Sequence, residues 1–279
     1  MTAGIVLLFL VAPLVVVPLG LRSIERANDG RQNRLMRMAI LSCVPSAMSL
    51  AIAFALTPGL LSGSLAVPWL ATTGLAAGSA ILGFGRDPAR LRPTPRRAMD
   101  VATGFLFVGA AFALADRADI RPFDFSATII LLTAVHFHFA GFALVLAGAL
   151  AWQARPGPTF GLAVGLLVVG IPLTALGFFG LPLIAWFGVI LVASGAIAVA
   201  IETLALGRGM SRGAGALATV AGIALLVSMP LAVIYSTGTV LGAAWLDIPT
   251  MARIHGSLNA LGFALPASLA WTIEGRLGS

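Results

Sequence analysis

The sequence predicts an all-α bundle of helices that spans a membrane. Of its 279 residues, 59% are hydrophobic and only 10% are charged, whereas soluble domains carry about 25% charged residues. Apolar runs of about 20 residues recur along the chain, which is the length of a helix that crosses a hydrocarbon layer. These runs are continuous rather than alternating, and this pattern favours helices over the strands of a membrane barrel.

Nine apolar stretches predict nine transmembrane helices in a single domain that covers residues 1–279. Proline and glycine punctuate the breaks between them, and the least distinct break lies at residues 177–182. No positive charges precede the first run, so we interpret it as a span rather than a secretory signal. The stretches lie near residues 3–20, 38–57, 63–84, 100–116, 126–152, 158–178, 181–205, 214–236 and 250–273.

Arginine placement predicts the orientation of these helices. The net charge of +7 comes from arginines beside the spans, so we expect no nucleic-acid partner. Only Arg117, Arg121 and Arg253 fall on the opposite side from the other 14 of the 17 basic residues. Cytoplasmic loops retain positive charge, which predicts an external N-terminus and a cytoplasmic C-terminus. The 14 are Arg22, Arg26, Arg31, Arg34, Arg37, Arg86, Arg90, Arg92, Arg96, Arg97, Arg155, Arg208, Arg212 and Arg276.

Two predicted spans carry polar residues deep in the apolar layer. The fifth contains HFHFAGF at 136–142, and the ninth contains HGSLNALGF at 255–263. Counted from the outer helix ends, His136 and His138 lie about 15 and 18 Å deep, and His255 and Asn259 about 8 and 14 Å deep. Ionisable groups inside a membrane are functional candidates. We therefore assign these four residues as candidate catalytic groups.

Helical geometry separates the two histidines of the fifth span. His136 and His138 point about 200° apart on a regular helix, so they do not readily chelate one ion. His255 and Asn259 are four residues apart and share a face. We expect His136 to face a cavity with them, because small residues continue its face, and His138 to hold the fifth helix against the bundle. The alternative for each histidine is a packing role through one hydrogen bond.

Other side chains are candidates at the edge of this layer. Asp116, near the outer interface, is a candidate proton donor or orienting carboxylate. Tyr235 is the only tyrosine; it either anchors the membrane interface or donates a hydrogen bond into the cavity. Aromatic residues in the two motifs either shape a pocket or simply contact core and lipid. The candidate substrate-binding residues are Tyr235, Thr133, Phe139, Phe142 and Phe263.

The motifs HFHFAGF and HGSLNALGF resemble the YndJ-like family of bacterial polytopic membrane proteins. The length of the chain and the number of predicted spans also fit that family. The resemblance implies that His136, His138, His255 and Asn259 form the polar core of the family. It implies a multi-pass protein of the bacterial cytoplasmic membrane, but it implies no particular activity.

Three kinds of function remain open at this point. We favour an intramembrane enzyme that uses acid/base chemistry, such as cyclisation, isomerisation or epoxide opening, on a terpenoid- or polyketide-like substrate without metal or cofactor. A transporter or binding protein for a small molecule is the main alternative, since such proteins also have polar groups near the middle of the membrane and proline-interrupted helices. Haem or metal ligation by histidines is the third. The partners expected are a lipophilic substrate and membrane lipids, with the oligomeric state left open.

Overall fold

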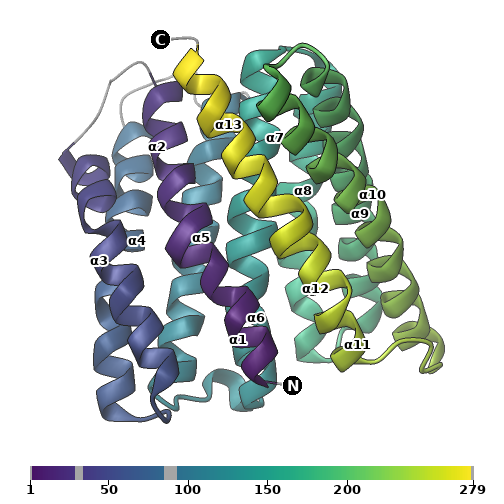
Figure 1. Cartoon of the computed structure of the whole chain (residues 1–279). Helices are drawn as coiled ribbons and strands as arrows, with labels where there is room; N and C mark the ends of the chain where they lie inside the picture. The colour runs from purple at the N-terminus through teal and green to yellow at the C-terminus, as the bar shows by residue number, and fades with distance from the viewer. Residues whose placement is uncertain (1, 29–33, 85–92, 278–279) are drawn as a thin grey trace.

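The computed structural model describes residues 2–28, 34–84 and 93–277. In these ranges nine helical segments pack into a single bundle (Figure 1). Within these ranges no residue forms a strand. The predicted helical membrane fold is therefore confirmed. The loop arginines Arg31, Arg86, Arg90 and Arg92 lie outside the described residues.

The first four segments form one side of the bundle. The first segment runs without a break through two α-helices and an intervening π-helix, in which each turn is wider than an α-turn. Thr94 caps the fourth segment by accepting a hydrogen bond from the backbone N–H of Arg97. The elements are α1 (Thr2–Val11), η1 (Ala12–Val16), α2 (Val17–Ala27), α3 (Arg34–Ala55), α4 (Leu60–Phe84) and α5 (Pro95–Arg117).

The next four segments complete the bundle. The doubtful boundary between the sixth and seventh is real: Gly180 adopts a left-handed φ of 77°, and Pro182 begins the following helix. A short 3-10 turn, η2 (Pro122–Asp124), precedes the fifth segment. The elements are α6 (Ala127–His136), η3 (Phe137–Leu144), α7 (Val145–Ala154), α8 (Pro158–Ala175), η4 (Leu176–Phe179), α9 (Pro182–Gly207) and α10 (Arg212–Leu241).

The ninth segment is more irregular than the sequence predicts. It contains α11 (Ile248–Arg253), α12 (His255–Ser257), η5 (Leu258–Ala264) and α13 (Leu265–Leu277), with an interruption at Ile254. The predicted helix near 250–273 is therefore present as a helical segment, but it departs from a regular α-helix at Ile254 and in η5. Pro266 lacks an N–H and crowds the carbonyl four residues earlier, and the wide turns of η5 lie at that point. The other eight segments are long and apolar enough to span a membrane, and the ninth runs alongside them (Figure 1).

The fifth segment occupies the centre of the bundle. In its membrane-crossing stretch 72% of the residues are buried, against 33–44% in the other seven continuous spans. Its elements α6, η3 and α7 contact the first, fourth, sixth, seventh and ninth segments. A polar side chain on this segment therefore meets protein rather than lipid.

Three π-helical elements pack in series across this centre. The element η3 contacts both η1 and η5, which belong to the first and ninth segments. Wide π-turns are frequent at functional sites because they change the direction of neighbouring side chains. His136 immediately precedes η3, and Asn259 lies within η5. The irregular backbone and the predicted polar residues thus coincide.

The helix ends and loops near the C-terminal end of the bundle carry most of the described arginines. There Arg155 pairs with Glu202 at 3.1 Å, and the Arg26 guanidinium donates to the carbonyl oxygen of Thr272. The opposite end, where the N-terminus lies, carries Arg117, Arg121 and Arg253. The alternation of loops supports nine crossings, while the side of the membrane that each end faces stays a prediction.

Cysteine labelling tests that orientation. In a Cys43→Ala background, which removes the single buried cysteine, new cysteines replace the exposed residues Asp124 and Arg208 at opposite ends. We expect a membrane-impermeant maleimide to label Asp124→Cys in intact spheroplasts, and Arg208→Cys only after lysis, because positive loops stay in the cytoplasm. The parent Cys43→Ala protein is the control. The reverse labelling pattern would contradict the orientation.

Candidate functional site

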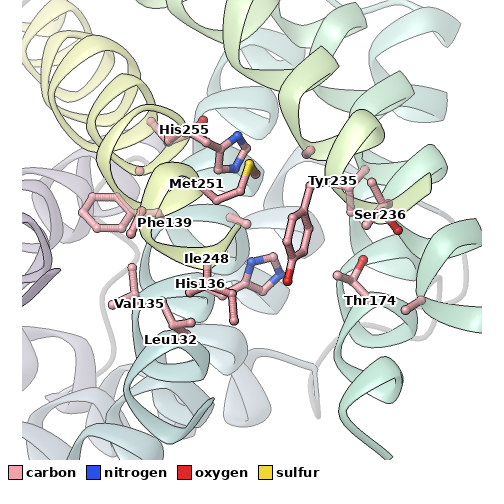
Figure 2. Close-up of a pocket in the computed structure, with 18 of the residues that line it drawn as sticks. Leu132, Val135, His136, Phe139, Thr174, Tyr235, Ser236, Ile248, Met251 and His255 are labelled. Atoms are coloured by element: carbon pink, nitrogen blue, oxygen red, sulfur yellow. Dashed lines mark hydrogen bonds between the residues drawn. The ribbon is translucent and has the colours of Figure 1, made fainter. Parts of the chain in front are cut away.

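A cavity of about 520 Å³ opens among the first and the fifth to ninth segments (Figure 2). Its size falls within the range of about 300–1,000 Å³ typical of small-molecule sites. None of its described lining residues is Asp, Glu, Lys or Arg, and most are aliphatic. Its polar lining residues are His136, Thr174, Tyr235, Ser236, Thr239, His255 and Asn259.

His255 is held by hydrogen bonds between the eighth and ninth segments. Its Nδ1 lies 3.0 Å from the Ser228 carbonyl oxygen, and a carbonyl only accepts, so Nδ1 carries the proton. The Asn259 amide donates to the His255 carbonyl at 2.8 Å and accepts from the Ser228 hydroxyl at 3.2 Å. In a neutral ring with Nδ1 protonated, Nε2 is left as an acceptor at the cavity.

Close backbone packing brings this group together. A Cβ atom at Gly262 would lie 2.8 Å from the Cβ of Ala224, so a larger residue there would push η5 away from α10. The approach places Ser228 of α10 within hydrogen-bonding distance of Asn259. Glycine at this position is therefore part of the reason that the eighth and ninth segments share one site.

His136 enters the cavity from the fifth segment. It is the last residue of α6, and its Nε2 is buried without a hydrogen-bond partner among the described residues. Figure 2 shows the Tyr235 hydroxyl of α10 pointing toward the His136 ring. Two imidazoles and one phenol from three segments thus converge on one apolar cavity. An unsatisfied buried nitrogen calls for an explanation, and a polar ligand group would supply its partner.

Thr133 does not line the cavity, although neighbouring positions of the fifth segment do. Leu132, Val135 and Phe139 line it on one side of His136, and Ile129 and Ala140 line it on the side to which Thr133 belongs. The Thr133 hydroxyl instead donates to the Ile129 carbonyl at 2.8 Å. Its assignment as a substrate-binding residue is corrected, because it does not line the cavity.

His138 is enclosed by protein, with 0% of its surface exposed. Its Nδ1 donates to the Ala134 carbonyl at 2.8 Å, and its Nε2 accepts from the Trp69 indole N–H at 3.1 Å. The ring also meets the edge of Phe9. A Cβ atom at Gly109 would lie 2.7 Å from Nδ1, so α5 needs glycine there. His138 has no free nitrogen and joins the first, third and fifth segments, which corrects its assignment as catalytic.

Asp116 lies outside the cavity, bound to its neighbour in sequence. The Arg117 side chain donates to the Asp116 carboxylate at 2.8 Å and to the Leu56 carbonyl at 3.2 Å, and its guanidinium lies over the Phe54 ring. This buried pair fixes the turn between α3 and α4, where Gly59 donates to the Arg117 carbonyl. Asp116 is therefore corrected from a proton donor to part of a structural ion pair.

Phe142 also lies away from the cavity. It is fully buried, and a Cβ atom at Gly20 would lie 2.7 Å from its Cζ, so the ring fills the contact between the fifth and first segments. Its assignment to substrate binding is corrected to core packing. The other predicted aromatic residues, Phe139, Phe263 and Tyr235, do line the cavity.

Comparison with known proteins places both motifs in one family. A family model described as "YndJ-like protein" matches residues 7–263, which include HFHFAGF and HGSLNALGF. The chain belongs to the YndJ-like family. The uncharacterized membrane protein YndJ of Bacillus subtilis (strain 168) is 27% identical over 273 residues, which cover 96% of this chain and 48% of that protein. The chain thus spans about half the length of this relative. No solved structure matches this chain.

This YndJ-like chain is a multi-pass membrane protein, and its cavity includes residues that the sequence did not single out. They are Thr174 on α8, Ser236 and Thr239 on α10, and Met251 on α11. A signal existed for α10, because Thr239 follows Tyr235 by four residues on one helical face. No such signal existed for Thr174, whose place depends on how α8 packs against the fifth segment. Among the described residues, no group of three or more His, Cys, Asp and Glu is arranged to hold a metal.

The indole that donates to His138 provides a test of its structural role. Trp69→Phe leaves the fully buried Nε2 acceptor without a donor, so we expect the free energy of unfolding to fall by about 1–3 kcal/mol. Thermal unfolding of the purified protein in detergent measures the change. Trp245→Phe, at a position with 55% of its surface exposed, is the matched control. Equal melting temperatures for the two variants would contradict a structural role for the bond.

Proposed function

We propose that this YndJ-like chain is an intramembrane enzyme that performs acid/base chemistry on a lipophilic small molecule. The observation that carries the proposal is the convergence of His136, His255 and Tyr235, from three segments, on one apolar cavity. Cyclisation, isomerisation and epoxide opening of a terpenoid- or polyketide-like molecule all need a positioned acid and base and no external reactant. The side chains of this cavity supply such groups.

The two histidines suit different roles. The His255 ring is oriented through Nδ1, so its Nε2 is available to accept a proton from the substrate. Tyr235 and His136 lie on the other side of the cavity, where one of them would return a proton to a developing oxygen or carbon anion. Asn259 holds the segment that carries His255 through its bond to the His255 carbonyl, so it is a positioning residue. Proton transfer of this kind contributes about 10²–10⁴-fold to a rate.

The apolar walls support the same proposal. Phe139 and Phe263 line the cavity beside the polar groups, and no charged side chain accompanies them among the described lining residues. Excluding water strengthens the interaction between an imidazole and a developing charge and protects reactive intermediates. A carbon skeleton would occupy the apolar volume while its reacting group meets the histidines.

A binding or transport function is the second candidate, and a separate feature favours it. Pro172 lies inside α8 and Pro230 inside α10, and both helices flank the cavity. Proline-interrupted helices around a polar site near the middle of the membrane are typical of transporters. Accumulation of a lipophilic compound in proteoliposomes without chemical change, driven by an ion gradient, would favour this candidate over the enzyme.

Substitution of His255 tests the enzymatic proposal. Purified protein in proteoliposomes is incubated with an organic extract of the native membranes, and mass spectrometry follows the loss and gain of compounds. We expect His255→Ala to lower turnover by about 10²–10⁴-fold, because it removes the oriented base. Ser42→Ala, which removes a hydrogen bond to Thr72 between α3 and α4, is the control and should keep the wild-type rate. Equal turnover in His255→Ala would remove this residue from the mechanism.

A further inference from the structure

The geometry points to an uncharged lipophilic alcohol as the ligand of this cavity, with its hydroxyl donating to His255 Nε2. This inference rests on the proposed function of the same site and narrows its substrate class. It follows from three properties of the cavity: its charge, its free hydrogen-bonding groups and the position of those groups along the membrane axis.

The charge distribution excludes ionised ligands. Within the described lining no carboxylate, ammonium or guanidinium is available to pair with a charge, and an unpaired charge in an apolar cavity is costly. The carboxylate at the rim belongs to Asp247, which shares a shallow depression with Tyr235, Thr239 and Ile248. Hydrogen bonds from Thr250 hold the pKa of Asp247 below its usual value, so it is ionised at neutral pH.

The free hydrogen-bonding groups select a donor on the ligand. His255 uses Nδ1–H on the Ser228 carbonyl, which leaves an acceptor at Nε2. Asn259 is already engaged through both its amide nitrogen and its oxygen. A hydroxyl satisfies His255 because it donates, whereas an ether, ester or ketone brings only acceptors. The Tyr235 phenol points into the cavity beside His136 (Figure 2) and can donate to an ether oxygen as well as to a hydroxyl, so it does not select between them.

The two histidines lie part-way along the cavity. His136 is nine residues from the start of α6 and His255 is seven from the start of α11, which places them about 14 and 10 Å from that end of the bundle. Ile129, Pro182 and Ile248 line the cavity close to the starts of their helices. Leu144 and Phe263 line the cavity deeper along the same segments. An alcohol would therefore bind with its hydroxyl part-way along the cavity and its carbon skeleton against the apolar walls on either side.

Four probes with one carbon skeleton test this assignment. The full chain in lipid nanodiscs is titrated with farnesol, farnesyl methyl ether, farnesoic acid and farnesylamine, and the dissociation constant of each is measured. We expect farnesol to bind about tenfold or more tightly than each of the others, because the ether leaves His255 Nε2 unsatisfied and the ions are buried unpaired. His255→Phe should bring the ratio of ether to alcohol dissociation constants close to one, while Ser42→Ala should preserve the wild-type ratio.

The four dissociation constants of the wild-type protein decide the assignment even if His255→Phe does not fold. Tyr235→Phe retains the ring and removes a donor that an alcohol and an ether could both use, so it should leave the ratio of ether to alcohol dissociation constants at its wild-type value. Equal binding of alcohol and ether, stronger binding of the acid or amine, or no binding of any probe would overturn the alcohol assignment. Selective binding of farnesol together with no conversion of any compound in the membrane extract would overturn the enzymatic proposal alone. Conversion of a charged compound would overturn the alcohol assignment alone.

Discussion

An imidazole buried in a membrane must find a hydrogen-bond partner for each ring nitrogen or carry the cost of leaving one unpaired. The three histidines of this chain meet that constraint to different degrees. His138 has a protein partner for each ring nitrogen and no exposed surface, so all of its hydrogen bonds are made within the bundle. His255 has one partner, at Nδ1. His136 Nε2 has none among the described residues. The two incompletely paired histidines both line the cavity, which is why we propose that cavity as the ligand site.

The central position of the fifth segment makes these arrangements compatible with a membrane. A helix with 72% of its crossing stretch buried is surrounded by protein, so its two histidines need not face hydrocarbon. Its wide turns at η3 lie against those of η1 and η5, which brings irregular backbone together where protein covers it. One face of the segment completes the core through His138 and Phe142, and another lines the cavity through His136 and Phe139.

Hydropathy and punctuation predict most of this fold, because both follow from the cost of exposing backbone and polar groups to lipid. They give the helical class, the nine segments and the boundary at residues 177–182. Helical angles also separate His136 from His138. Neither hydropathy nor helical angles predict the role of Asp116. Its partner, Arg117, is adjacent in the sequence, and the contact of Arg117 with the Leu56 carbonyl depends on how distant segments pack. The break at Ile254 and the place of Thr174 depend on packing between segments, which one sequence does not specify.

The unpaired nitrogen of His136 links the stability of the bundle to its function. Leaving a buried polar atom without a partner costs about 1–3 kcal/mol, and a single residue of another type on this face would avoid that cost. Packing does not require the imidazole, because Leu132, Val135 and Phe139 already form the apolar part of the same face. A ligand group that bonds to this nitrogen would remove that cost. This cost argues for a site that binds a polar group and against a histidine that merely fills the core.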